Sequence, residues 1–262
     1  MSQPVSVTID EVFVAIYALL FLLAVAAAFK QGFSRAAGFF SLVLFTGVKL
    51  AGNAILIYVY HDNYKNTNMV TTGYILRGLG YSFLVSSVIS FLSGVYNADQ
   101  PPKSKKPFLL RLLHLANIAA LVLLIMGYSN SDSVFDGTST DGKLDSKAPI
   151  GDAIFAVITV FAFLFTLFLF PRSSSHHRKI LVRVVLALPL MLVRVGFGTY
   201  KTAHRDFLKS FTVWQNLGFE WVEEVLAVLL LLSVAFVGKD RDEMRGSGKW
   251  EERYPLNYAH SP

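Results

Sequence analysis

The apolar residues of this chain gather in seven long runs that are separated by short polar stretches. Because each run holds roughly 20 residues or more, each can cross the roughly 30 Å of bilayer hydrocarbon as an α-helix. The pattern predicts an all-α polytopic membrane protein, with a seven-helix transmembrane domain in residues 1–238 and a polar, poorly ordered tail in residues 239–262. The predicted spans are 11–29, 36–60, 70–96, 109–128, 150–170, 180–200 and 217–238.

The basic residues between the runs predict the orientation of the helices. Lys and Arg number 14 on the side of the bilayer that includes the tail, and six on the other side. Since basic residues are enriched in cytosolic loops, we expect the tail in the cytosol and the N-terminus in the lumen or exterior. The stretch before the first run has no basic residue, so this run is predicted to be a retained helix rather than a cleaved signal peptide.

The composition agrees with a membrane protein and excludes several other classes. Hydrophobic residues make up 53% of the chain and charged residues 16%, against about 25% charged residues in an ordinary soluble domain. The net charge of +6 comes from the loops that set the topology, so no nucleic-acid partner is expected. The chain has no Cys, which excludes disulfides, thiolate nucleophiles and cysteine metal sites.

Several charged or polar residues nevertheless lie inside the apolar runs. With the predicted orientation they map to the lumenal leaflet, although they come from different helices. A charge at the bilayer centre costs about 2.5–3.5 kcal/mol, and such side chains usually face the bundle interior and pair. We therefore expect them to line one polar cavity. Small residues at four-residue spacing place the third run in the centre of the bundle. The polar set comprises Lys49, Asn53, Arg77, Arg194, Glu220, Glu223 and Glu224.

Such a cavity favours acid chemistry that needs no metal and no cofactor. The sequence has no aspartate-rich diphosphate motif, no P-loop, no HExxH and no GxSxG, and its seventh run has no lysine for a retinal Schiff base. A buried carboxylic acid that keeps its proton can donate it. Aromatic faces can then stabilise a developing carbocation. The rings expected to do so are those of Tyr74, Tyr81 and Trp221.

Glu224 and Glu223 are the candidate proton donors, and Glu224 is preferred because it lies deepest in the seventh run. A donor must hold a proton at neutral pH, so we expect Glu220 or Glu223 to pair with the cations and leave Glu224 free. Glu224→Gln should then lower product formation at least roughly 100-fold, while the protein accumulates normally. An ion-pair network with a purely structural role is the alternative. The residues expected to orient the acid and the substrate are Lys49, Asn53, Arg77, Arg194 and Glu220.

Four stretches of the sequence resemble a known family. They read "GFSRAAGFFSLVLFTGVKLAGNAI", "LLRLLHLANIAALVLLIMGY", "LPLMLVRVGFGTY" and "EVLAVLLLLSVAFVG". Together they resemble fungal seven-helix integral membrane proteins, some of which are membrane-bound terpene cyclases of the ascofuranone and ascochlorin type. The match falls on Lys49, Arg194 and Glu224. Lys49 stands where the family pattern has arginine, which keeps the charge but removes bidentate pairing.

The resemblance implies cyclisation of a prenylated, often epoxidised, aromatic compound by protonation. The expected function is therefore a metal-independent terpene cyclase, an isomerase or lyase of fungal meroterpenoid biosynthesis. Its farnesylated substrate would come from the bilayer of the endoplasmic reticulum or another endomembrane, where other pathway enzymes are expected partners. The alternatives are a transporter or exporter of lipids or small molecules, and a receptor-like protein without catalysis. Polar residues concentrated in one leaflet favour the enzyme.

Overall fold

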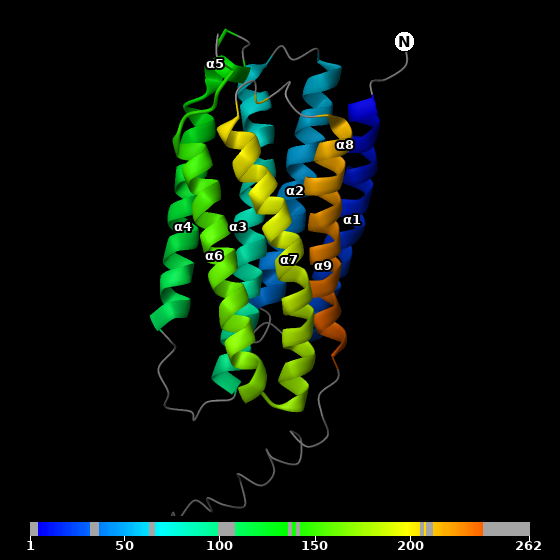
Figure 1. Cartoon of the computed structure of the whole chain (residues 1–262). Helices are drawn as coiled ribbons and strands as arrows, with labels where there is room; N and C mark the ends of the chain where they lie inside the picture. Colours follow the sequence, from blue (N-terminus) through cyan, green and yellow to red (C-terminus); the bar gives the residue numbers. More distant parts are fainter. Residues whose placement is uncertain are drawn as a thin grey trace, which may run out of the picture.

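The computed structural model describes residues 5–31, 37–62, 66–98, 108–135, 138–139, 142–204, 207 and 212–237. In these residues the chain forms a bundle of long helices that run side by side, with no strand in the same ranges (Figure 1). The protein is therefore all-α over the described part of the chain, as the sequence predicts. The predicted tail, residues 239–262, lies outside the described residues.

Six helices are long and apolar enough to cross a membrane. They confirm the first six predicted spans, and their ends extend beyond most of the predicted limits because the polar residues at both ends continue the helical hydrogen bonding. This number of long apolar helices identifies a membrane protein. The six are α1 (Val5–Gln31), α2 (Ala37–His61), α3 (Thr67–Ala98), α4 (Phe108–Ser129), α6 (Lys147–Leu169) and α7 (Ser175–Ala203).

The seventh apolar run is helical but not a single regular helix. It begins with α8 (Val213–Asn216), continues through a π turn, η2 (Leu217–Trp221), into α9 (Val222–Ser233), and ends in a 3₁₀ turn, η3 (Val234–Phe236). These segments follow one another without a break. The α9 segment alone has 12 residues, fewer than a bilayer crossing requires, so the seventh span stays a prediction.

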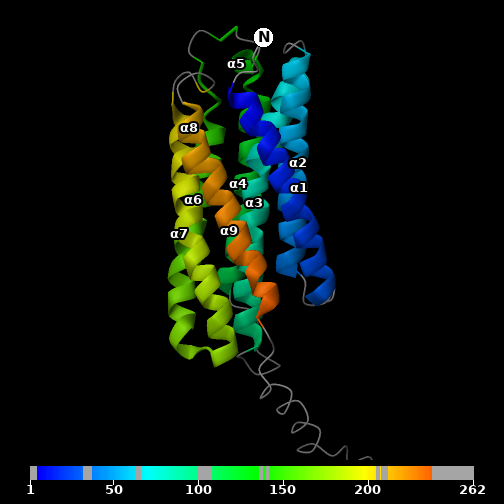
Figure 2. The same ribbon diagram turned by 90° about the vertical axis from the view of Figure 1, so that its right-hand side faces the viewer.

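The helices are arranged around α3. Figure 2 shows α1 and α2 beside each other, and α6 and α7 on the other side of the bundle, with α9 between α7 and α1. The α3 helix contacts α2, α4, α6 and α7. In the most apolar stretch of α3 more than half of the residues are buried, against 28% in that of α1. This confirms the prediction that the third run is the central helix.

One end of the bundle carries the polar interior. The helix α1 begins there, and α7 ends and α8 begins at the same end (Figure 1); we call it the amino-terminal end. The short helix α5 (Asp132–Phe135) lies there too. The outward faces of α1, α4 and α6 instead expose large apolar side chains such as Leu22, Leu115 and Leu164, as expected of surfaces that contact lipid. Which side of the membrane this end faces stays a prediction.

Candidate functional site

Glu224 lies in the first turn of α9, and its side chain is buried at 1% exposure. Its Oε2 accepts a hydrogen bond from the Tyr17 hydroxyl at 2.9 Å and lies 2.7 Å from Lys49 Nζ. Its Oε1 accepts a hydrogen bond from Arg194 Nε at 2.5 Å. Both carboxylate oxygens are therefore engaged, and the contacts join α9 to α1, α2 and α7.

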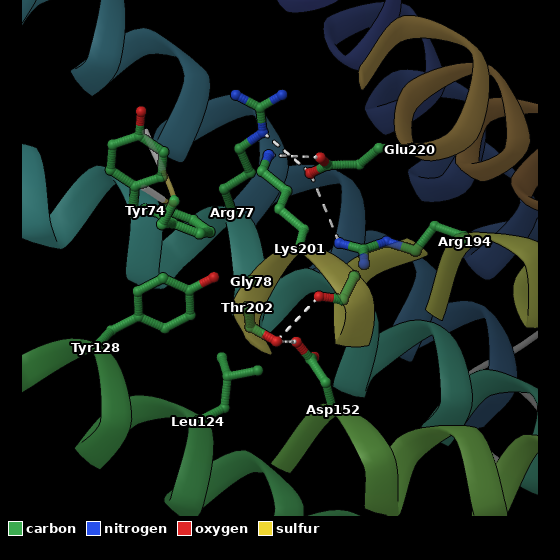
Figure 3. Close-up of a pocket in the computed structure, with 12 residues that line it drawn as sticks. Tyr74, Arg77, Gly78, Leu124, Tyr128, Asp152, Arg194, Lys201, Thr202 and Glu220 are labelled. Atoms are coloured by element: carbon green, nitrogen blue, oxygen red, sulfur yellow. Dashed lines mark hydrogen bonds and ion pairs between the residues drawn. The ribbon is translucent and has the colours of Figure 1, made fainter. Parts of the chain in front are cut away.

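Glu220 lies one turn earlier, in the π turn, and is also buried. Its Oε1 lies 3.3 Å from Arg77 Nε and 3.7 Å from Arg194 Nη2, and its Oε2 lies 3.3 Å from Lys201 Nζ. Figure 3 shows these three cations converging on the one carboxylate. Single π turns inside α-helices are frequent at functional sites, and this one carries the residue with the most cationic partners in the cluster.

Two further acids belong to the cluster. Asp10 on α1 lies 3.7 Å from Arg77 Nη1. Asp152 on α6 is 6% exposed, and its Oδ2 lies 3.0 Å from the Thr202 hydroxyl. Within the described residues, Asp152 forms no ion pair. The cluster therefore sets four cations against four carboxyl groups, namely Lys49, Arg77, Arg194 and Lys201 against Asp10, Asp152, Glu220 and Glu224.

Two glycines make room for the buried cations. A Cβ atom added to Gly80 on α3 would lie 2.8 Å from Lys49 Cε, and one added to Gly198 on α7 would lie 2.6 Å from Arg194 Nη1. The added Cβ at Gly198 would also lie 3.8 Å from Asp152 Oδ2. Arg194 and Asp152 thus face each other across the space that Gly198 leaves open.

A small polar cavity opens beside this cluster. Its volume is about 30 Å³, and its wall includes Arg77, Lys201, Glu220, Asp152 and Tyr128 (Figure 3). A water molecule needs about 10–15 Å³ of such volume, so the cavity has room for about two to three waters. Glu224 and Lys49 do not belong to its wall. The cavity therefore meets the ion-pair network on its Glu220 side.

An aromatic cluster adjoins the cavity at the amino-terminal end. The Tyr74 ring stacks on Phe135 at a centroid distance of 5.3 Å, and Phe207 packs edge-on against Tyr74 at 5.8 Å and Tyr128 at 6.0 Å. The Phe207 backbone N–H donates to the carbonyl of Gly142 at 3.1 Å. Phe207, which lines the cavity, and Phe135, which packs against Phe207, both come from segments between the long helices.

Comparison with known families places the chain in one of them. Residues 5–241 match the family described as a domain of unknown function, DUF7702. The chain belongs to this family. The match includes every described helix, so the charged cluster and the cavity are parts of the family's domain. No significant match is found among the curated proteins or the solved structures. The family description says nothing of terpene cyclases or of fungi, and the resemblance to fungal cyclases stays a prediction.

The structure brings together most of the polar residues that the sequence singled out. Lys49, Arg77, Arg194, Glu220 and Glu224 form one connected network. Of these, Arg77, Arg194 and Glu220 line the cavity but Lys49 and Glu224 do not, so the prediction of one shared cavity is confirmed only in part. The functional role of these residues stays a prediction.

Two of the predicted polar residues stay outside this network. Asn53 is buried on α2 one turn beyond Lys49, and its Oδ1 has no hydrogen-bond partner in the described part of the chain. Glu223 is half-buried, and its Oε2 also lacks a partner there. Glu223 points elsewhere because neighbouring residues on a helix project about 100° apart.

The expectation that Glu224 is left free of cations is wrong. Glu224 holds Lys49 and Arg194, while Glu223 holds neither. The physical reason is depth: Lys49 lies near the middle of α2, and Glu224 is the deepest of the three glutamates. A buried lysine needs a carboxylate at its own level.

The three predicted cation-stabilising rings have different surroundings. Tyr74 belongs to the cavity wall. The Arg77 guanidinium carbon lies 4.5 Å from the centroid of the Trp221 ring, and that of Arg194 lies 5.2 Å from the centroid of the Tyr81 ring. Neither Trp221 nor Tyr81 lines the cavity. These two rings already face protein cations, so they support the network rather than a bound substrate.

Four participants were missed or read differently from the sequence. Lys201 lies just beyond the predicted span 180–200, although it is seven residues, about two turns, after Arg194 and thus on the same face of α7. Asp10 pairs with Arg77, and Tyr17 and Tyr128 supply buried hydroxyls. The spacing of Lys201 was a usable signal. Tyr17 and Tyr128 carry no such signal because tyrosine is also common in lipid-facing belts.

Proposed function

We propose that the protein is a membrane-embedded acid catalyst, a metal-independent terpene cyclase that acts on a prenylated aromatic compound, with Asp152 as its proton donor. Asp152 replaces Glu224 and Glu223 in this role. The observation that carries the proposal is that Asp152 is a buried carboxyl group on the cavity wall with no ion pair among the described residues. A carboxyl group in such a place can keep a proton and donate it.

The surroundings of Thr202 support a protonated Asp152. The Thr202 hydroxyl lies 3.0 Å from Asp152 Oδ2, 3.0 Å from the carbonyl of Gly198 and 3.2 Å from that of Thr199. A hydroxyl has one hydrogen to donate. When that hydrogen goes to a carbonyl of its own helix, Thr202 can accept a hydrogen bond from protonated Asp152.

The cavity also offers what the reaction needs after proton transfer. Arg194, across the space at Gly198, stabilises the carboxylate that Asp152 becomes. The rings of Tyr74, Tyr128 and Phe207 offer their faces to a developing carbocation. Lys201 and Arg77 can orient a polar head group on the substrate.

A farnesylated substrate requires the cavity to widen. Pockets for small molecules usually measure about 300–1,000 Å³, roughly ten to thirty times the 30 Å³ of this cavity. Phe135 and Phe207 are the rings that can move at least cost, because they belong to connections between helices rather than to the long helices. We propose that their displacement admits the substrate.

The proposal includes the placement of the protein in the cell. The chain would cross an endomembrane seven times, with its amino-terminal end toward the lumen, so that the cavity lies in the lumenal leaflet. The hydrophobic substrate would come from the bilayer, and enzymes of the same meroterpenoid pathway would share the membrane.

Microsomes that contain the protein test the proposal. They are supplied with farnesylated phenols and their terminal epoxides, and cyclised products are sought by chromatography and mass spectrometry. Asp152→Asn keeps the size of the side chain but has no acidic proton, so it should lower product formation at least roughly 100-fold. Glu223→Gln is the matched control and should retain activity. Wild-type turnover in a well-accumulated Asp152→Asn protein would exclude Asp152 as the donor, and a wild-type protein that converts none of these compounds would exclude the cyclase.

A further inference from the structure

Tyr128 presents a buried hydroxyl that the network does not use. Its side chain is 6% exposed, and its ring packs in the aromatic cluster. Its hydroxyl points into the cavity in Figure 3, and within the described residues no hydrogen bond to it is formed. A buried tyrosine hydroxyl usually has a hydrogen-bond partner. The cavity is therefore the place where its partner binds.

The chemistry of the wall fits water as that partner. The cavity of about 30 Å³ admits about two to three water molecules, each of which needs two to four polar contacts. Tyr128 supplies one, and Asp152 supplies another through Oδ1, because only Oδ2 contacts Thr202. Lys201 and Glu220 add charged groups to the same wall. An apolar ligand of this size would leave the Tyr128 hydroxyl and Asp152 Oδ1 without a hydrogen-bond partner.

We propose that the cavity binds a water molecule between Tyr128 and Asp152, and that this water is a co-substrate. The second part rests on the proposed cyclase function. It specifies the outcome of the reaction: the final carbocation is captured by water, and the product is a cyclised alcohol rather than a cyclised olefin. Tyr128 is a positioning residue that holds the water.

The steps balance in atoms and charge. Asp152 gives its proton to the epoxide oxygen or the terminal alkene, the C–O or π bond breaks, and a carbocation forms after ring closure. The water oxygen then forms a C–O bond with the cation. A proton of that water returns to the Asp152 carboxylate, which restores the acid. The sum is substrate plus one water, and no oxidant or other reactant is needed.

Two measurements test the two parts. The first is a crystal or cryo-EM structure of the full chain at a resolution that shows ordered waters elsewhere, for the wild type and for Tyr128→Phe. We expect density within hydrogen-bond distance of Tyr128 Oη and Asp152 in the wild type, and its loss in the variant. A wild-type cavity without such density overturns the water site, whatever the substrate of the protein is.

The second measurement is turnover in H₂¹⁸O. The product should carry one ¹⁸O atom and be heavier than the substrate by one water. In Tyr128→Phe the ratio of alcohol to olefin should fall by roughly five- to tenfold, the effect of losing one hydrogen bond to the water. Tyr58→Phe is the control, because Tyr58 is exposed on α2 and does not line the cavity, and it should leave the ratio unchanged.

The outcomes separate the two proposals. Cyclised products without ¹⁸O keep the cyclase and overturn the role of water as a co-substrate. An unchanged ratio in Tyr128→Phe, with ¹⁸O incorporated, overturns the position assigned to the water. Absence of turnover with every substrate refutes the proposed function, and the density beside Tyr128 then decides the water site alone.

Discussion

At the scale of single residues, the Glu224 carboxylate connects four helices. It receives Lys49 from α2, Arg194 from α7 and Tyr17 from α1, and it belongs to α9. Replacing a whole buried ion pair by apolar groups can be neutral, but removing one partner leaves the other charge uncompensated. Glu224 is therefore expected to stabilise the bundle more than to take part in proton transfer.

Glu224→Gln should destabilise the protein. The amide cannot neutralise Lys49 and Arg194, and breaking a buried pair in this way costs about 3–5 kcal/mol of unfolding free energy. This expectation corrects the earlier one, that the variant accumulates normally. Thermal unfolding of the purified protein in detergent measures the effect. Glu223→Gln on the same turn should change the free energy by less than about 0.5 kcal/mol. Equal stability of the two variants would contradict the assignment.

Gly198→Ala on α7 should destabilise the protein by disturbing the ion pairs of Arg194. The added methyl group would lie 2.6 Å from Arg194 Nη1, so the guanidinium must shift, and its ion pairs with Glu220 and Glu224 are disturbed. Overpacking of this kind costs about 1–3 kcal/mol. Gly196→Ala is the matched control, since nothing lies within 4 Å of its added Cβ, and it should stabilise the helix by about 0.5–1 kcal/mol. Comparison of the two unfolding temperatures checks the prediction, and a Gly198→Ala protein as stable as Gly196→Ala would contradict it.

Which charged residues lie inside the bundle could be predicted from the sequence, but which of two neighbouring acids pairs could not. Arg77 and Arg194 stand alone in apolar runs, so their burial follows from the cost of exposing a charge to lipid. At the start of α1, for example, Asp10 faces Arg77 whereas its neighbour Glu11 is exposed. The choice depends on helix rotation, and the even hydrophobicity of α1 does not define which face is inward.

At the scale of elements, the π turn positions the side chains of the seventh helical segment against α7. The turn places Glu220 opposite Arg77 and Lys201, and Lys201 Nζ also donates to Asn216 Oδ1 at 3.0 Å. The capping box at Thr212, where Thr212 and Gln215 bond reciprocally, fixes the start of α8. The cap could be read from the residues "TVWQ". The π turn could not, because it arises from contacts with other helices.

The start of α6 should be sensitive to acid. The Lys147 backbone N–H donates to Asp145 Oδ1 at 2.9 Å, and Asn130 Nδ2 donates to Oδ2 at 3.2 Å. These bonds favour the charged form and hold the pKa of Asp145 below its usual 3.8. A lowered pKa in the folded state means that the stabilisation is present above the usual pKa and is lost as the pH falls through the folded value.

The unfolding temperature, measured between about pH 6 and about pH 2, should show this loss. Near pH 6 the unfolding temperature of the wild type should be higher than that of Asp145→Asn, because the amide lacks the negative charge that these hydrogen-bond donors favour. The difference should shrink below about pH 4 as Asp145 takes up a proton. A difference that is constant over the whole range would mean that the carboxylate charge contributes nothing there.

At the scale of the whole molecule, the hydrophobic pattern predicted the long helices of the bundle. It did not predict how the connections between helices pack at the amino-terminal end. Span length follows from the thickness of the bilayer, so six apolar runs became the six long helices. The exposed Tyr58, Tyr200 and Trp214 lie at the ends of α2, α7 and α8, where an interfacial aromatic belt is expected. The pairing of Phe135 with Phe207 was not predictable, because it joins two connections that are distant in sequence.

The predicted topology determines which side of the membrane the cavity faces. Lys201 belongs to α7 and pairs with Glu220, so removing it from the six basic residues assigned to the lumenal side leaves five, against 14 on the cytosolic side. The asymmetry therefore increases. A glycosylation tag placed between Ser139 and Gly142, away from the buried Val134 and Leu144, should be modified in the lumen. A reporter fused after Pro262 should be cytosolic.

The two readouts together also count the spans. The tag follows the fourth span, so its side depends on orientation alone, whereas the side of the reporter depends also on whether the segment from Val213 to Phe236 crosses the membrane. A modified tag with a lumenal reporter would mean six spans, with the glutamates of the seventh segment on a helix that enters and leaves on the same side. An unmodified tag would invert the bundle, and Asp152 with its cavity would then face the cytosolic leaflet. The same tag placed after Ser104 is the control and should stay unmodified, because that loop lies one span earlier.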